Sequence, residues 1–517
     1  MLKLVLGASG SGKTTLLYAR IRARAEAGKR SILLVPEQFT SSTEARIYRE
    51  LGDALSGMVE SYSFTSLAEH ILAALGGAAV QTLTDAGRAV LVRRALEELQ
   101  DNVHYYYRHR RSAAFCQMAA ETIDELKSAG LSGQQLQELA RDCGSESAKL
   151  GELALIFQGY ESLLAGTGMD PADRLELAAD RLEAALARDE LPDFLREREV
   201  FIDEFDTFNA PKKRLMGAML AALPAVTVAL CEDGAPMQPG DLELFSGAKQ
   251  VAAQLRQLAR KNGAQVAAPE LLRRDLRHKD APGLAALTEL LETGSCTPPE
   301  SAPELRLFAA ASREEEARCA AAAIRRLMRQ GVRCGKIAVV CRDISLYRAA
   351  VRYEFRMAEI PLYCDEPTTP EFSAPATAVR ALLALLRGAD MTEQLTVLAK
   401  TGLCDLTEPE VCALENYAYT WSPNAAAWRA EFTKSPRGFG DAELTEEDTL
   451  NLTRAENARK KLVTAVDTLR GKVRSANAEQ ISRALYFCLK ELGAEGQQAA
   501  QVEDIRTARG IPAAEEA

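Results

Sequence analysis

Short apolar runs alternate with longer amphipathic stretches over the first 75 residues of the chain. Residues 2–6 form an apolar run that a glycine-rich loop follows, and residues 31–36 form a second run that ends at Pro36. A third run begins at residue 58 and continues into a stretch with helical spacing. Apolar residues at helical spacing also separate the runs, which predicts a βαβ unit with parallel strands.

The pattern becomes entirely helical between Thr84 and about Leu195. Apolar residues recur there at helical spacing, with Asp and Ser at the expected starts and Gly at the stops. Strand character returns at residues 196–208 and 225–233. We therefore expect a helical subdomain inserted into an α/β domain that resumes after it. Residues 234–302 are rich in Pro, Gly and charge, which predicts irregular or linker structure.

A second strand–helix–strand pattern begins near residue 303. Residues 304–331 predict a strand followed by a helix, and residues 336–343 predict the next strand. After about Gly388 the pattern is helical again. The expected organisation is a first α/β domain (1–80 and 196–302), its helical insertion (81–195), the first part of a second α/β domain (303–388) and a second helical insertion (389–517).

Composition and charge narrow the class of protein. The 517 residues are 47% hydrophobic, 26% charged and 6% aromatic, the balance of a helix-leaning globular protein with several domains. The formal net charge is −10, so the chain is not a polycation that coats nucleic acid. Any contact with DNA would need a local groove.

Cysteine usage and the N-terminus indicate a cytoplasmic protein. The 11 cysteines include no C-x-x-C pair and the chain has 4 histidines, so neither a zinc site nor a disulfide framework is indicated. Isolated thiols fit a reducing compartment. The N-terminus has no basic n-region, and no apolar run approaches a membrane-spanning length, so we expect no membrane contact.

The loop after the first apolar run matches the pattern G-x-x-x-x-G-K-[ST]. In that pattern the glycines let backbone N–H groups face phosphates, the lysine neutralises phosphate charge and the hydroxyl holds Mg²⁺. The alternative is an ordinary glycine-rich turn between a strand and a helix. The match predicts an ATP site with Mg²⁺ on Thr14, and the nucleotide-binding residues would be Gly7, Ala8, Ser9, Gly10, Ser11, Gly12, Lys13, Thr14 and Thr15.

Two acids end the apolar run at residues 200–202. Asp203 would bind Mg²⁺ and Glu204 would polarise the attacking water, as in phosphoryl-transfer sites of P-loop proteins. Two acids at a strand end are also common at solvated strand termini. The phosphate loop upstream favours the functional interpretation.

Polar and aromatic residues follow two other strands, in segments 35–40 and 60–66. Parallel strands end at one edge of a sheet, so these residues should emerge near the phosphates. Aromatic side chains there could stack on bases and hydroxyls could contact phosphates of single-stranded DNA. Equally, the aromatics could be core and the hydroxyls could cap helices. The candidates are Phe39, Thr40, Tyr62, Ser63, Phe64 and Thr65.

A basic aromatic run, residues 105–111, lies inside the helical insertion. Arg108, Arg110 and Arg111 follow three tyrosines, a combination that suits stacking and phosphate pairing with single-stranded nucleic acid. A charged surface turn beside a buried tyrosine is the more ordinary explanation.

Several segments together resemble one known family. In chain order they are GASGSGKTTLL, ILLVPEQFTSSTEARI, VESYSFTSLAEHIL, VFIDEFDTF, the stretch from SREEEARC to VVCRD, EIPLYCDEP and LENYAYTW. This series resembles the B subunit of the AddAB (RexAB) ATP-dependent helicase–deoxyribonuclease over essentially the whole chain. VPEQFT and LENYAYTW are specific to that subunit, whereas the phosphate loop and the acidic strand are shared with superfamily 1 helicases.

The resemblance implies a superfamily 1 helicase-like α/β fold with two RecA-like P-loop domains and large helical insertions. It implies an A subunit as partner, which carries the active motor, and processing of double-strand DNA ends for recombination, with recognition of the Chi sequence. Members also have a C-terminal nuclease domain with a four-cysteine iron–sulfur cluster. No D…E-x-K nuclease core or clustered cysteines occur here, so we expect this chain to be the N-terminal, helicase-like part and to cut no DNA.

Two departures from the helicase pattern favour a weak motor. No helicase-type arginine motif can be placed in residues 304–517, and ALCEDGAP lacks the Gln-centred motif that couples hydrolysis to DNA. Glu204 favours the opposite conclusion, because a glutamate after the strand aspartate makes this chain better suited to hydrolyse ATP. The alternatives are an architectural DNA-guiding subunit with a vestigial nucleotide site and an autonomous P-loop helicase or other ATPase.

Overall fold

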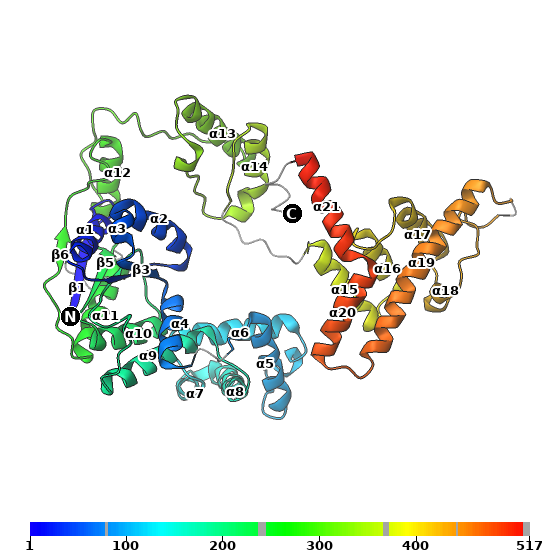
Figure 1. The fold of residues 1–517 in the computed structure, drawn as a ribbon, viewed down its shortest axis with the longest axis horizontal. Coiled ribbons are helices and arrows are strands. Elements are labelled where there is room, and N and C mark those ends of the chain that lie inside the picture. The colour runs from blue at the N-terminus through cyan, green and yellow to red at the C-terminus, as the bar shows by residue number, and fades with distance from the viewer. Residues whose placement is uncertain (78–80, 236–243, 365–371, 441–442, 510–517) are drawn as a thin grey trace. The chain divides into compact units, whose positions relative to one another are not determined.

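The structure, a computed structural model, describes residues 1–77, 81–235, 244–364, 372–440 and 443–509 (Figure 1). The chain divides into two compact units, Met1–Phe308 and Ala309–Ala517. Each unit has its own secondary structure and its own core, and the two are described separately below.

The first unit is built on one parallel sheet of six strands. Its order is β3-β2-β4-β5-β1-β6, and every neighbouring pair is parallel. The strands are β1 (Leu2–Gly7), β2 (Ser31–Leu34), β3 (Val59–Tyr62), β4 (Glu199–Ile202), β5 (Ala225–Cys231) and β6 (Glu270–Leu272). The predicted α/β class with parallel strands is confirmed, including the return of strands after the helical stretch.

Helices cover both faces of this sheet, which explains why the strand segments are continuously apolar. Leu4 and Leu6 of β1 point into one core, and Val5 between them points into the other. One face is covered by α1 (Lys13–Glu26), α2 (Thr40–Leu51) and α3 (Asp53–Ser56). The other face is covered by α4 (Phe64–Leu75), α9 (Pro171–Ala187), α10 (Ala210–Ala222) and α11 (Ser246–Lys261).

The predicted helical insertion forms a core of its own. Val92, Ile123 and Phe157 are buried in it, at 0–1% exposure. Its helices are α5 (Asp85–Glu98), α6 (Ala113–Ser128), α7 (Gly133–Ala140) and α8 (Ser147–Leu164). The next helix, α9, instead packs Ala178 and Leu182 into the core under the sheet. The stretch 81–195 is therefore helical as expected, but its last helix belongs to the sheet.

The expectation of irregular structure over residues 234–302 is wrong for most of that stretch. It contains α11, strand β6 and α12 (Pro282–Thr293), while residues 236–243 lie outside the described part. Val5 of β1 pairs with Glu270 of β6, so the segment completes the sheet. Strand β6 is only three residues long and sits among charged residues, and this weakens the pattern that would predict it.

The expected second α/β domain (303–388) contains no strand among its described residues, although residues 304–310 and 336–343 carry the two predicted strands. Leu307 is 100% exposed and Val340 is 91% exposed. Helices α13 (Arg313–Arg329) and α14 (Ile344–Met357) form as expected and pack Ala321 against Phe355 in a small core. A helix satisfies its own backbone hydrogen bonds, whereas a strand needs a neighbour. A second RecA-like sheet is thus not seen in the described residues.

The remainder of the second unit is a helical bundle around Trp428, which is 0% exposed. The indole Nε1 of Trp428 donates to Thr392 Oγ1 at 2.9 Å, and its carbonyl accepts from Arg459 at 2.8 Å. The helices are α15 (Ala374–Leu386), α16 (Met391–Lys400), α17 (Glu408–Trp421), α18 (Ala425–Arg429), α19 (Glu446–Val473), α20 (Ala478–Leu492) and α21 (Ala494–Arg509). None of the helices in the described part combines the length and apolar character that crossing a bilayer requires.

Candidate nucleotide-binding site

The loop between β1 and α1 has the backbone of a phosphate-binding turn. Gly10 and Gly12 have φ values of +82° and +91°, in the left-handed region that side chains disfavour. Gly12 is the N-cap of α1, and its carbonyl accepts the first helical bond from Leu16 at 2.9 Å. The free N–H groups of the first helical turn therefore face the loop, where the helix dipole favours an anion.

Lys13 and Ser11 supply the polar side chains of this loop. Lys13 Nζ donates to the carbonyl oxygens of Gly7 at 2.7 Å and Ala8 at 2.8 Å, which draws the ammonium under the loop. Burial lowers the pKa of Lys13, and the charge of Asp203 acts in the opposite direction. The Ser11 hydroxyl is buried and has no hydrogen-bond partner among the described residues. The loop thus offers a cation and an unused hydroxyl to a ligand.

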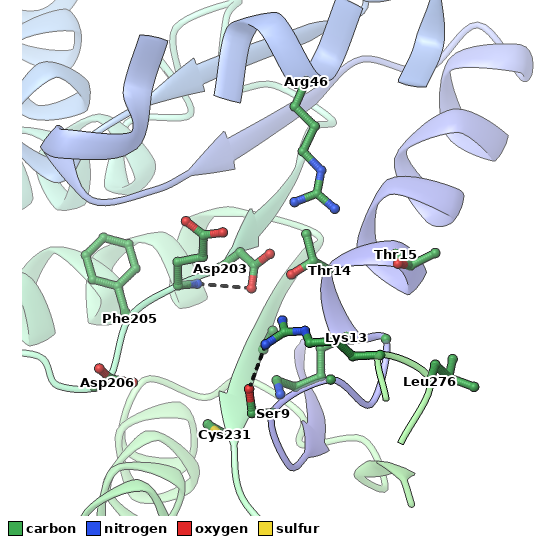
Figure 2. A pocket seen from close by; sticks show the side chains of 15 residues that line it. Ser9, Lys13, Thr14, Thr15, Arg46, Asp203, Phe205, Asp206, Cys231 and Leu276 are labelled. Atoms are coloured by element: carbon green, nitrogen blue, oxygen red, sulfur yellow. Dashed lines mark hydrogen bonds between the residues drawn. The ribbon is translucent and has the colours of Figure 1, made fainter. Parts of the chain in front are cut away.

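Asp203 lies at the end of β4, on the same edge of the sheet as the loop. Strand β5 separates β4 from β1, so the two strand ends are about 10 Å apart, which leaves room for a phosphate and a cation between them. Burial raises the pKa of Asp203, while hydrogen bonds from the Thr14 hydroxyl and the Glu204 amide act to lower it. Thr14 and Asp203 therefore face each other across the edge (Figure 2).

Glu204 adopts a backbone conformation that is uncommon for a residue with a side chain. Its φ is +65°, and its N–H donates to Asp203 Oδ1 at 3.0 Å. Partial burial of its carboxyl group raises the pKa of Glu204 although the residue as a whole is exposed, the neighbouring charge of Asp203 raises the pKa further, and Arg46 counteracts both. Such strain costs of order 1–3 kcal/mol and is concentrated at functional sites.

These groups line one hollow of about 450 Å³. Figure 2 shows Lys13 and Thr14 on one side and Asp203 on the other, with Arg46 above them. The lining residues are Ser9, Gly10, Gly12, Lys13, Thr14, Thr15, Arg46, Asp203, Glu204, Phe205, Asp206, Ala229, Cys231, Leu276 and Arg277. Most of the residues that the sequence proposed for ATP are among them, and Gly7 reaches the site through its bond with Lys13.

Arg277 is a site residue that sequence reasoning missed. Its Nη1 donates to Ser9 Oγ at 3.2 Å, and the neighbouring Leu276 N–H donates to the Gly10 carbonyl at 3.0 Å. The segment after β6 therefore lies against the phosphate loop. The signal was the apolar pair before the basic run RRDLRHK, within a stretch assigned to a linker.

The oxygen donors present suit Mg²⁺ but would not hold it alone. Thr14 and Asp203 offer a hydroxyl and a carboxylate, which are hard ligands of the kind that Mg²⁺ prefers. Within the described ranges, no group of three or more His, Cys, Asp or Glu residues could form a metal site. A magnesium ion here would need further ligands, such as phosphate oxygens and water.

A second hollow of about 530 Å³ lies beside the first and shares Thr14, Arg46, Asp203 and Glu204 with it. Phe39 lines this hollow and is 37% exposed. Of the other residues proposed for DNA, Thr40 Oγ1 donates to the Glu37 carbonyl at 2.9 Å, and Thr65 Oγ1 donates to Glu37 Oε1 at 2.7 Å. Both hydroxyls are exposed, so they could exchange these local bonds for a phosphate.

Three of the proposed DNA-binding residues have structural roles instead. Phe64 is 1% exposed and packs in the core against Phe205, so it cannot stack on a base, and that expectation is wrong. Ser63 is buried and caps α4 by accepting from the Ser66 N–H at 3.1 Å. Tyr62 is half-buried, and its hydroxyl donates to Glu60 at 2.8 Å. For these three residues the structure agrees with the alternative interpretation, in which the aromatic residues pack in the core and the hydroxyls cap helices.

The arginine-bearing turn belongs to the helical insertion. The carboxylate of Glu152 accepts from the backbone N–H groups of His104 and Tyr105 at 2.8 Å, and Tyr106 packs against Phe115. These contacts fix the turn on the insertion core. Arg108 and Arg111 are exposed, and within the described part of the chain neither guanidinium has a hydrogen-bond or ion-pair partner, whereas Arg110 is half-buried and engaged. Among the described residues, no hydrogen bond or ion pair joins Arg108 or Arg111 to the sheet edge.

Comparison with known proteins assigns the family. Residues 4–288 match the family model described as "ADDB, N-terminal", which is more than half of the chain. The chain belongs to the AddB family. The matched region contains the phosphate loop, the acidic strand end, Arg277 and all of the sheet except the first two residues of β1.

Longer AddB relatives match over most of the chain. Proteins named as the B subunit of an ATP-dependent helicase/deoxyribonuclease are 30% identical in Moorella thermoacetica, over 100% of this chain and 46% of the relative, and in Desulforudis audaxviator, over 96% and 44%. The Symbiobacterium thermophilum protein of that name is also 30% identical, over 83% of this chain and 38% of its own length. The chain spans about half the length of these relatives and corresponds to their N-terminal part.

Proposed function

We propose that the sheet edge of the first unit binds Mg²⁺-ATP as part of a helicase–deoxyribonuclease subunit that processes DNA ends. One observation carries this proposal: a glycine-rich phosphate loop faces a buried aspartate across one intervening strand, in a hollow of about 450 Å³. The names of the relatives, which are ATP-dependent helicase/deoxyribonuclease subunits, agree with this use.

Each side chain has a definite task in this proposal. The loop amides and Lys13 bind the phosphates, and the Thr14 and Asp203 oxygens hold Mg²⁺, which supplies charge neutralisation when bound. Phe205 and Phe208 stack with ring centroids 5.4 Å apart just beyond Glu204, which fixes the chain that leaves the strand. Glu204 accepts a proton from the attacking water.

Turnover in this chain is proposed to be slow. The end of β5 and the residues that follow it read CEDGAP, which contains no glutamine to connect hydrolysis to DNA. Glu204 is exposed, so a water held against it is poorly shielded from bulk solvent. The chain then acts mainly as a nucleotide- and DNA-binding partner of an A-type helicase–nuclease subunit that carries the motor, with a part in Chi recognition.

DNA is proposed to meet two surfaces. Phe39, Thr40 and Thr65 lie around the second hollow and the adjoining strand ends, and Arg108 and Arg111 project from the insertion with free guanidinium groups in the described structure. Aromatic stacking and arginine–phosphate pairing both suit single strands. Changing Arg108 and Arg111 together to Ala should weaken binding and flatten its salt dependence.

Nucleotide titration of the chain tests the central proposal. Lys13→Ala should abolish Mg²⁺-ATP binding, because the phosphates then lie near the Asp203 and Glu204 carboxylates without the ammonium that offsets their charge. Lys29→Ala is the matched control, because Lys29 is exposed and lies outside the hollow. Glu204→Gln should leave binding intact. If the wild-type chain binds no nucleotide, the proposal fails and an architectural role with a vestigial site takes its place.

A further inference from the structure

Helix α2 carries an arginine into the nucleotide hollow that the phosphate loop and the acidic strand do not account for. Arg46 is half-buried, and its guanidinium carbon lies 4.8 Å from the centre of the Tyr18 ring. No carboxylate among the described residues approaches the guanidinium within 4.0 Å. The cation is thus held by an aromatic face and has unused donors.

The Arg46 side chain points to the place in the hollow where the phosphates would bind. Figure 2 shows Arg46 pointing from its helix towards Thr14 and Asp203, while Lys13 approaches from the opposite side. Arg46 lowers the pKa values of both Asp203 and Glu204 against the effect of their burial. Arg46 therefore acts as a counter-charge to both carboxylates.

A bound nucleoside triphosphate would add negative charge to the hollow near Arg46. If the nucleotide binds as proposed above, Thr14 and Asp203 would hold Mg²⁺, which would neutralise phosphate charge, and the loop amides and Lys13 would bind the phosphates. A third phosphate would extend the anion beyond the loop, towards the side of the hollow from which Arg46 enters. A diphosphate ends before that point.

We propose that Arg46 is the group that recognises the terminal phosphate and makes the site prefer a nucleoside triphosphate to a diphosphate. The guanidinium is weakly hydrated and planar, so it can leave its general attraction to the two carboxylates and donate two hydrogen bonds to phosphate oxygens. The Tyr18 ring holds the side chain near this position before the ligand arrives, which lowers the entropy lost on binding.

This inference rests on the proposed nucleotide site, and the test separates the two. Dissociation constants for Mg²⁺-ATP and Mg²⁺-ADP are measured on the chain and on Arg46→Ala, Arg46→Lys and Arg22→Ala. Arg22 is exposed on α1 and lies outside both hollows, so its variant controls for the loss of one positive charge. Thermal denaturation of each variant checks that the fold is retained.

Arg46→Ala should weaken ATP binding about 10–100-fold, as expected for loss of a charge-assisted bidentate contact, and change ADP binding about twofold at most. Arg46→Lys should retain part of the preference, because lysine keeps the charge but not the fork geometry. Arg22→Ala should leave both constants unchanged.

Three results would overturn the inference. Equal weakening of ATP and ADP by Arg46→Ala and Arg46→Lys would make Arg46 a general electrostatic or structural group. Unchanged ATP binding in a folded Arg46→Ala variant would place the terminal phosphate elsewhere. A wild-type chain that binds neither nucleotide would refute the nucleotide site itself, and the inference would fail with it.

Discussion

Two sets of apolar runs in this chain have similar sequences and different structures. Residues 2–6 and 31–34 form strands that are almost fully buried, and Leu2 and Ile32 are 0% exposed. Residues 304–310 and 336–342 are comparable in length and apolar content, yet they form no strand, and Leu307 is 100% exposed. The helices that follow the runs, α1 and α2 in one case and α13 and α14 in the other, form in both.

The difference lies in the neighbours and not in the runs themselves. Strand β1 pairs with β5 along its whole length, and from Val5 to Gly7 it also pairs with β6 on its other side. Residues 305–308 and 337–341 have no strand beside them among the described residues. A helix is specified by its own sequence, whereas a strand also requires a partner, and a run of suitable residues does not create one.

Hydrogen exchange should show the largest difference between the two sets. Amides of residues 4–6 and 226–230 are in paired strands, so we expect protection near the global stability of the unit, about 10⁴-fold or more. Amides of residues 305–308 and 337–341 should exchange close to the rate of an unstructured peptide. Mass spectrometry of the exchanging chain resolves both. Strong protection of residues 337–341 would mean that they pair in solution, and the contrast would disappear.

Matched phenylalanine truncations should measure the same contrast as stability. Phe201 in β4 is 0% exposed, so Phe201→Ala should lower the free energy of unfolding by about 3–5 kcal/mol through lost burial and a cavity. Phe308 is 54% exposed, so Phe308→Ala should change it by less than about 0.5 kcal/mol. Urea unfolding followed by circular dichroism gives both values. Similar losses in the two variants would contradict the comparison.

Replacing two aspartates that follow apolar runs, Asp203 and Asp343, should show the smallest difference in stability between the two sets. Burial raises the pKa of Asp203, so its ionisation disfavours the folded state, and Asp203→Asn should raise the stability of the ligand-free chain at neutral pH. The gain should shrink as the pH falls through the raised folded pKa towards the unfolded value of about 3.9, where the carboxyl is neutral in both states.

Asp343 provides the control for that measurement. It follows the run at residues 336–342, is exposed, and caps α14 by accepting from the Ser345 N–H at 2.9 Å. Asparagine caps a helix about as well as aspartate, so Asp343→Asn should have little effect. Thermal unfolding between pH 4 and 7.5 compares the two variants. A stabilising, pH-dependent effect at Asp343 would indicate that it too is buried at a sheet edge.

The sequence predicts those parts of the site whose residues lie close together in the chain or at the end of one apolar run. Gly10, Gly12 and Lys13 lie in one contiguous motif, and Asp203 ends one apolar run, so the sequence alone indicates both. Arg277 and Arg46 reach the same hollow only because the strands are ordered as they are. That order follows from long-range pairing, which no local pattern contains.

The error at Phe64 has a related cause. Phe39 and Phe64 both follow strands at the same edge, and nothing in their immediate sequence distinguishes an exposed aromatic from a buried one. Phe64 begins α4, whose inward face already carries Leu67 and Ile71, and the aromatic cluster with Phe205 takes it into the core. Assigning it requires the packing of α4 against the segment after β4.

The strand order also determines when each strand can pair during synthesis on the ribosome. Leu2 pairs with Val226, so the first strand emerges and then waits for its neighbour for roughly 10–45 s at 5–20 residues per second. During that interval the helical insertion is translated, and it can bury its own core around Phe157 without the sheet. The nascent chain therefore carries an unpaired apolar strand beside a folded helical body, and a chaperone that shields the first 7 residues would act in this interval.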